Sequence, residues 1–243
     1  MPSKKPTSSA IADHIRRLLK DGGSAPHSED VQWFFKEEIK SRGWYTAELR
    51  RVAVRVRRTL LKEKGLPFLL EVANKLFTGR VLEERVFAVL LLETLTDRFG
   101  DAEFRLFESW LSRVSSWADH DGLVYYLISP MVAAKPVRSR AVFRWAKSPN
   151  RWHRRAASVA LIRGARQRMF FKEIQRLTAL LLSDEDDMVQ KGLGWLLRET
   201  AKFDPRRTAP YLETIAKKSP RLVLRTACET LPARTRKTIL ACG

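Results

Sequence analysis

Cysteine, histidine and long apolar runs are all scarce in this chain. Its 243 residues include two cysteines, Cys228 and Cys242, which cannot build a disulfide framework and indicate a reducing compartment. The four histidines are scattered and no zinc-ligand spacing occurs, so we expect no metal and no other cofactor. The longest apolar run, VFAVLLLE, is far too short to cross a membrane. The first ten residues are polar and lack the apolar core of a secretory signal, so we expect a cytoplasmic protein.

Acidic residues are also in short supply relative to basic ones. Lys and Arg number 46 against 27 Asp and Glu, which gives a formal net charge of +19. A surplus of this size destabilises a compact state through self-repulsion, so it indicates a polyanionic partner. Nucleic acid is the first candidate and an anionic membrane surface the second. With 44% hydrophobic residues, the chain can still bury a sizeable core.

Almost every segment has the apolar spacing of a helix, and no strand pair with a hairpin turn stands out. In TAELRRVAVRVRRTLLKEKG (46–65), Thr46 is expected to cap a helix and Gly65 to end it. RVLEERVFAVLLLETLTDRFG (80–100) is apolar over more of its circumference, which predicts a buried helix. One face of the first of these helices is basic and consists of Arg51, Arg55, Arg58 and Lys62.

Breakers such as Gly and Pro fall at short intervals and cut the chain into about twelve helices of roughly 10–20 residues. Short connections make antiparallel neighbours, and successive helix pairs are typical of solenoids such as HEAT repeats. We therefore predict an all-α, right-handed superhelical solenoid of HEAT-like helix pairs with a concave basic face that binds DNA. Residues 1–8 are predicted to be a flexible basic tail and 9–243 a single HEAT-like repeat domain, with DGGSAPHSED (21–30) as a linker between the first two helices.

Three places in the sequence put a tryptophan beside charged residues in an arrangement suited to chemistry. In SSWADHDG (115–122), Trp117 and Asp121 are four residues apart, which places both on one face of a helix. The other two places are SPNRWHRRAA (148–157), with Trp152, Arg154 and Arg155, and VQKGLGWLLRE (189–199), with Lys191, Trp195 and Arg198. A single tryptophan is more often a core anchor, and the expected core tryptophans are Trp33, Trp110 and Trp145.

These motifs, together with GWYTAELR (43–50) and PRLVLRTACETL (220–231), resemble the AlkD-type HEAT-like repeat DNA glycosylases from about residue 33 to residue 231. The resemblance implies hydrolysis of the N-glycosidic bond of cationic alkylated purines, such as 7-methylguanine and 3-methyladenine, in double-stranded DNA. It implies base excision repair by a monomer associated with the nucleoid, with no cofactor and no full flipping of the base. Carried over residue by residue, Asp121 matches the catalytic aspartate, Trp117 and Trp195 the two cleft tryptophans, and Arg155 the arginine that holds the backbone near the lesion. The residues expected along the DNA backbone are Tyr45, Thr46, Arg154, Lys191 and Arg198.

The chemistry of the residues agrees with that resemblance. A purine alkylated at N3 or N7 is cationic and already a good leaving group, so one carboxylate can suffice where glycoside hydrolysis uses two. Loss of the base builds positive charge on the deoxyribose, which a nearby carboxylate stabilises and tryptophan faces attract. Three residues depart from the family's pattern. Trp44 and Tyr45 are bulky rings able to stack on the duplex, and His120 places an imidazole beside Asp121.

Two other readings remain open. The first is a non-catalytic HEAT-repeat protein that binds damaged or branched DNA with the same basic face. The second is a protein-interaction scaffold, which would explain the solenoid but not the charge. A carboxylate that repels phosphate brings nothing to a simple DNA binder, so the set of Trp117, Asp121 and Trp195 favours the enzyme.

Overall fold

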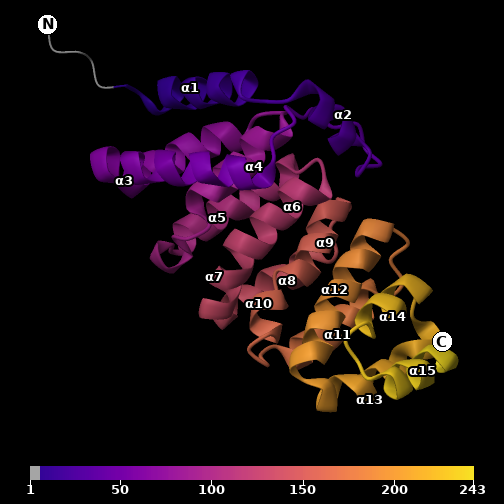
Figure 1. The fold of residues 1–243 in the computed structure, drawn as a ribbon. Helices are drawn as coiled ribbons and strands as arrows, with labels where there is room; N and C mark the ends of the chain where they lie inside the picture. The colour runs from indigo at the N-terminus through magenta and orange to yellow at the C-terminus, as the bar shows by residue number, and fades with distance from the viewer. Residues whose placement is uncertain (1–5) are drawn as a thin grey trace, which may run out of the picture. The chain divides into compact units, whose positions relative to one another are not determined.

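The computed structural model describes residues 6–243, and every regular element within them is helical (Figure 1). The all-α prediction is confirmed, although the fifteen α-helices of this range outnumber the twelve expected and several are shorter than ten residues. None of these helices is long and apolar enough to cross a membrane. The chain divides into two compact units, Met1–Leu123 and Val124–Gly243. The single repeat domain over residues 9–243 stays a prediction.

Unit 1 is built around a buried helix, α4 (Leu82–Leu92), which confirms the first half of the buried helix predicted over residues 80–100. Helices α1, α3 and α6 all contact α4, and α1 also packs on α3 (Figure 1). The other elements of the unit are α1 (Ser8–Asp21), α2 (Ala25–Gln32), α3 (Thr46–Phe77), η1 (Thr96–Arg98), α5 (Asp101–Trp110), η2 (Leu111–Arg113) and α6 (Trp117–Leu123). Most of the predicted tail, residues 1–5, lies outside the described residues, and Thr7 caps α1.

Helix α3 contains a kink at Gly65, the residue predicted to end it. Gly65 has φ 79° and ψ 177°, a backbone conformation that residues with a side chain rarely adopt. Pro67 follows two residues later, and proline lacks the N–H that an uninterrupted helix would use. Two helical segments therefore meet at Gly65, and the first of them carries the basic row Arg51, Arg55, Arg58 and Lys62, which is exposed throughout.

Three local predictions for unit 1 are wrong. The expected linker 21–30 includes most of α2, because Ser24 accepts a hydrogen bond from a first-turn N–H and Pro26 suits the first turn. Thr46 is the first helical residue and not the cap, a position that Tyr45 occupies without a side-chain hydrogen bond. Trp33 is 93% exposed, because it follows the last residue of α2 in an irregular segment that turns no helical face inward. The other two expected core tryptophans, Trp110 and Trp145, are buried.

Unit 2 is organised around its longest helix, α12, which contacts α9, α10, α11, α13 and α14. Its elements are the π-helical η3 (Val124–Ile128), α7 (Ser129–Ala134), η4 (Pro136–Ser139), α8 (Arg140–Trp145), α9 (Arg151–Val159), α10 (Ile162–Ala165), α11 (Phe171–Leu181), α12 (Asp187–Phe203), α13 (Pro205–Ile215), η5 (Ala216–Lys218), α14 (Arg221–Ala227) and α15 (Ala233–Cys242). A Cβ at Gly192 would lie 3.0 Å from Cγ of Arg155, and one at Gly194 would lie 2.8 Å from Cβ of Thr226. The two glycines therefore let α9 and α14 approach α12 closely.

The two cysteines differ in environment, which gives a simple test of the packing of unit 2. Cys228, at the C-terminal end of α14, is buried and Cys242 is exposed, and burial raises the pKa of the Cys228 thiol. We expect an aromatic disulfide reagent at pH 8 to modify one thiol per native chain and both thiols in denaturant. Rapid reaction of both thiols in the native protein would contradict the packing of α14.

Candidate functional site

Asp119 fixes the N-terminus of α6. Its Oδ1 accepts hydrogen bonds from the Ser116 backbone N–H at 2.8 Å and the Ser116 hydroxyl at 2.7 Å, which resembles the reach-back half of a capping box. Its Oδ2 lies 2.7 Å from Nη1 of Arg85 on α4 and accepts the Ser115 N–H at 3.0 Å. This carboxylate is fully buried, so it holds α6 against α4 and is closed to a substrate.

Asp121 lies two residues further along α6 in a different setting. Its side chain is 22% exposed, and Trp117, one helical turn earlier, is also partly exposed. Oδ1 of Asp121 lies 2.7 Å from Nδ1 of the fully buried His120. An ionised carboxylate can only accept, so Nδ1 of His120 is the donor. Asp121 is thus an accessible carboxylate whose orientation is fixed from behind by a buried ring.

Trp117 lies against the segment that follows α2. Its indole stacks on Phe35 with the ring centroids 5.0 Å apart, and its Nε1 donates to the Phe34 carbonyl at 3.4 Å. Trp117 lines a cavity of about 320 Å³ together with Tyr45 and Thr46. Unit 1 therefore brings together three of the residues assigned to DNA and lesion contacts.

Trp195 lies in unit 2 beside a tyrosine that the sequence analysis missed. The ring centroids of Trp195 and Tyr125 are 5.2 Å apart, and Arg163 stacks over the Tyr125 ring at 4.4 Å. Arg166 donates to the Tyr125 hydroxyl at 2.7 Å, and its hydrogen bond to Glu199 raises the pKa of the Arg166 guanidinium. The available signal was the position of Tyr125 in the sequence, four residues after Asp121.

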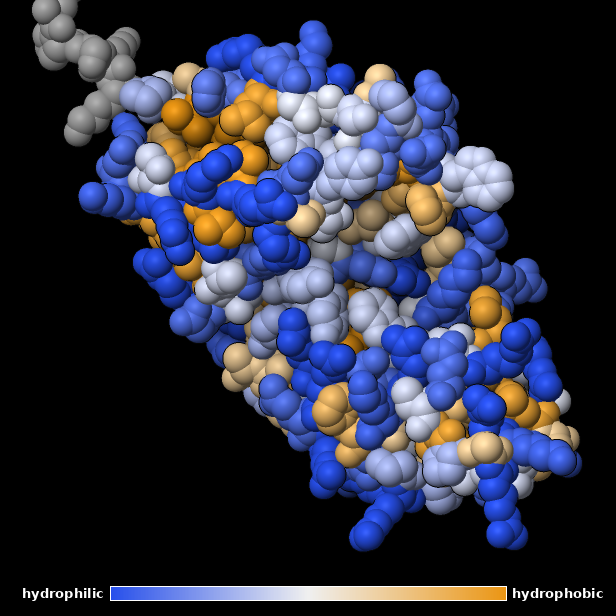
Figure 2. Space-filling model, in the orientation of Figure 1, coloured by the Kyte–Doolittle hydropathy of each residue, from blue (hydrophilic) through white to orange (hydrophobic). Residues whose placement is uncertain are grey.

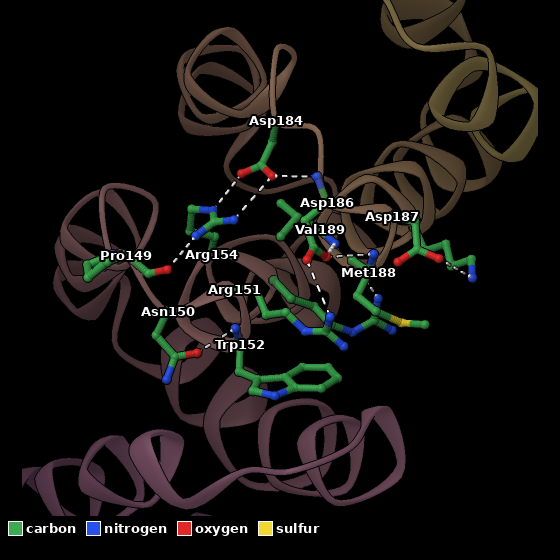
Figure 3. A network of polar contacts seen from close by, with 12 residues as sticks. Pro149, Asn150, Arg151, Trp152, Arg154, Asp184, Asp186, Asp187, Met188 and Val189 are labelled. Atoms are coloured by element: carbon green, nitrogen blue, oxygen red, sulfur yellow. Dashed lines mark hydrogen bonds and ion pairs between the residues drawn. The ribbon is translucent and has the colours of Figure 1, made fainter. Parts of the chain in front are cut away.

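Arg154 and Arg155 on α9 are both engaged within unit 2. Arg154 makes a two-pronged ion pair with Asp184, at 2.6 and 3.3 Å, and also donates to the carbonyl of Pro149 at 2.9 Å (Figure 3). Arg155 is 5% exposed, and its Nη1 donates to the Met188 carbonyl at 2.6 Å. Both guanidinium groups join α9 to the region around the start of α12, and their contacts with DNA stay predictions.

Lys191 and Arg198 keep their charges nearer to solvent on α12. Lys191 pairs with Asp187 at 3.2 Å one turn away, and Arg198 pairs with Glu229 at 2.9 Å. Surface pairs of this kind contribute little to stability, typically about 0–1 kcal/mol. These two cations can therefore exchange a carboxylate for a phosphate at small cost.

The predicted site residues divide between the units. Trp117, Asp121, Tyr45 and Thr46 belong to unit 1, whereas the set from unit 2 comprises Arg154, Arg155, Lys191, Trp195 and Arg198. The assembly of both sets into one slot stays a prediction. Within residues 6–243, no group of three or more His, Cys, Asp or Glu side chains could hold a metal ion.

The all-helical fold agrees with the result of comparing the sequence with known protein families. The chain belongs to the family described as DNA alkylation repair enzyme, whose model matches residues 15–231. No curated protein gives a significant sequence match.

Solved structures with the same fold include three bacterial proteins. A predicted DNA alkylation repair enzyme from Enterococcus faecalis superposes with a TM-score of 0.77 at 16% identity, covering 87% of this chain and 97% of the other. AlkD2 from Streptococcus mutans gives a TM-score of 0.61 at 22% identity, with 92% and 100% of the two chains covered. The protein smu.31 from Streptococcus mutans gives 0.60 at 20% identity, covering 91% and 100%. At these identities the likeness establishes the shared fold.

The environment of Asp119 generates a stability prediction. Asp119→Asn leaves Arg85 buried without its counter-charge, and breaking a buried pair in this way costs about 3–5 kcal/mol. We expect the free energy of unfolding, measured in urea, to fall by at least about 3 kcal/mol. Asp97→Asn, at an exposed position of the same unit, is the matched control and should change it by less than about 0.5 kcal/mol. Equal stability of the two variants would contradict this role of Asp119.

Proposed function

We propose that the protein is a DNA glycosylase that hydrolyses the N-glycosidic bond of cationic alkylated purines in double-stranded DNA, including 7-methylguanine and 3-methyladenine. The observation that carries the proposal is the accessible carboxylate of Asp121, one turn from Trp117 and held by a buried histidine, in a chain of the DNA alkylation repair enzyme family. Release of the damaged base would begin base excision repair.

The proposed reaction needs one carboxylate and one water. The bond between C1′ of the deoxyribose and the purine nitrogen breaks, and its electron pair goes to the purine, which leaves as a neutral base. Positive charge then develops on the sugar, where the Asp121 carboxylate stabilises it electrostatically. Water attacks C1′ and gives up a proton to the carboxylate, which leaves an abasic site. The base needs no general acid because its own positive charge makes it a good leaving group.

The two neighbouring aspartates support this single-carboxylate scheme. Glycosidases that use two carboxyl groups need both of them beside the reacting bond. Asp119 is buried and committed to Ser116 and Arg85, so only Asp121 of this pair is open to a sugar. The hydrogen bond from the buried His120 ring keeps the Asp121 carboxylate in place, and a preorganised charge stabilises a transition state more effectively than a mobile one.

The DNA contacts belong to the same proposal. The exposed basic row of α3 can follow a phosphate backbone, and hydrophilic residues cover much of the face shown in Figure 2. We propose that helix pairs arranged as a curved repeat present such rows on a concave face, that Trp195 and Trp117 flank the cationic nucleotide, and that the base stays in or near the duplex. Arg155 would hold the backbone beside the lesion. Residues Tyr45, Thr46, Arg154, Lys191 and Arg198 would contribute further backbone contacts.

One observation favours a second candidate, a non-catalytic protein that binds damaged or branched DNA. Arg155 is 5% exposed and already donates to a backbone carbonyl. A guanidinium in that position needs local rearrangement before it can grip a phosphate near a lesion. An assay of base release from alkylated DNA separates the two candidates, because the second one binds without releasing a base.

Asp121→Asn tests the assigned chemistry. The amide keeps the size of the carboxylate and removes its charge, so we expect the rate of single-turnover release of 7-methylguanine and 3-methyladenine to fall at least about 100-fold. Affinity for the alkylated duplex should be retained or should increase, because a charge that repels phosphate is gone. Thermal unfolding measured alongside reports whether the variant is folded.

Asp97→Asn is again the control and should excise at the wild-type rate. Asp119→Asn is unsuitable for this purpose, because its carboxylate is part of the fold. If a stably folded Asp121→Asn variant released the base at the wild-type rate, Asp121 would have no part in the reaction.

Binding of undamaged duplex should depend steeply on salt. A basic surface that neutralises about 5–8 phosphates gives a log–log slope of affinity against salt concentration of roughly −4.5 to −7. Arg55→Ala, in the exposed row of α3, should make this slope less steep by about one. Affinity that does not change between about 50 and 200 mM salt would contradict binding through phosphates.

A further inference from the structure

The cavity beside Trp117 is lined mainly by rings. It has a volume of about 320 Å³, near the lower end of about 300–1,000 Å³ for small-molecule sites. Aliphatic side chains, Thr46 and Glu83 complete its walls, and the rings that line it are His27, Phe34, Phe35, Trp44, Tyr45 and Trp117. All of these lie in unit 1. A space of this size and lining fits one flat aromatic group.

Two stacked pairs hold the rings of the cavity in place. His27 lies parallel to Tyr45, with the centroids 4.0 Å apart and the planes at 15°. Phe35 lies parallel to Trp117, at 5.0 Å and 13°. Flat surfaces that are already oriented lose little conformational entropy when another ring joins them. The cavity wall is therefore preorganised for stacking.

A buried carboxylate fixes the loop that carries Trp44 and Tyr45. Glu83 accepts hydrogen bonds from the Ser41 hydroxyl at 2.7 Å and from the backbone N–H groups of Arg42 and Gly43 at 2.8 and 3.0 Å. The indole N–H of Trp44 donates to the Leu19 carbonyl at 2.8 Å. These bonds engage the Glu83 carboxylate and the Trp44 indole N–H within the fold, so the cavity offers an occupant mainly stacking surfaces.

The charge around the cavity selects the kind of occupant. Thr46 and Leu49 of α3 line it, and the exposed row that starts at Arg51 begins two residues further along the same helix. Ring surfaces beside exposed cations are the combination with which proteins hold unstacked nucleobases and their phosphates. A peptide partner would gain nothing from the formal charge of +19 unless it were acidic.

We propose that this cavity takes a single nucleobase that has lost its pairing partner, such as the base opposite an excised or displaced purine. The proposal rests on the DNA-binding part of the proposed function and is separate from the chemistry at Asp121. Filling the cavity with the orphaned base would hold the duplex open without flipping the damaged purine itself. The stacking would tolerate any base, because every base has a flat face.

The test compares two duplexes that differ at one position. In the first, 2-aminopurine stands opposite a tetrahydrofuran abasic analogue, and in the second it stands opposite thymine. The wild-type protein should bind the first about tenfold more tightly, as expected for one stacked base. The fluorescence of 2-aminopurine should be quenched in that complex, because it stacks on a ring.

Phe34 and Trp33 supply a matched pair of variants. Phe34 is 72% exposed and lines the cavity, whereas its neighbour Trp33 is 93% exposed and does not. Phe34→Ala should abolish most of the preference and the quenching, and should leave the affinity for the paired duplex within about twofold. The hydrogen bond of Trp117 to residue 34 uses the backbone carbonyl and is kept. Trp33→Ala should behave like the wild type.

The remaining outcomes overturn the proposal. Equal affinity of the wild type for both duplexes would show that the cavity does not bind an unpaired base. A preference that survives in Phe34→Ala would come from the flexibility of the duplex at the abasic analogue and not from stacking. Equal loss in both variants would indicate general apolar adhesion, and a change of oligomeric state in Phe34→Ala would indicate a protein contact. Failure to bind even the paired duplex would overturn the proposed function as well.

Discussion

The buried ion pair between Asp119 and Arg85 is the interaction on which the candidate site depends. It joins the first turn of α6 to α4, and the Ser116 bonds to the same carboxylate set where α6 begins. The start of the helix fixes which of its residues turn outward. Trp117 and Asp121 are partly exposed because Asp119 and His120 are held inside. A carboxylate that builds the fold thus places a second carboxylate that is open to solvent.

This division of labour explains how one short stretch, WADHD, can be both structural and reactive. Asp119 is neutralised by a cation and accepts from five further hydrogen-bond donors within the fold. Asp121 meets the His120 ring, which orients it while part of it remains at the surface. Two carboxylates of the same residue type differ in role because their surroundings differ. A sequence motif alone cannot make that distinction.

Much of the fold could be predicted from helical periodicity, because apolar spacing decides which face of a helix is buried. The buried α4 and the break at Gly65 are examples. The exposure of Trp33 and the start of α2 could not be predicted from periodicity, because they depend on how an irregular segment packs. The internal engagement of Arg154 and the ring of Tyr125 beside Trp195 depend on contacts between residues about 30 and 70 positions apart. Spacing within one helix carries no information about such partners.

The most direct test of the account is product analysis with the wild-type protein and a duplex containing 7-methylguanine, in buffer with a metal chelator. Hydrolysis through a single carboxylate requires no metal. The account predicts free 7-methylguanine in solution and an abasic site in the strand, in equal amounts. Tight binding of the duplex with the modified base still attached would contradict it and would identify the protein as a binder of damaged DNA.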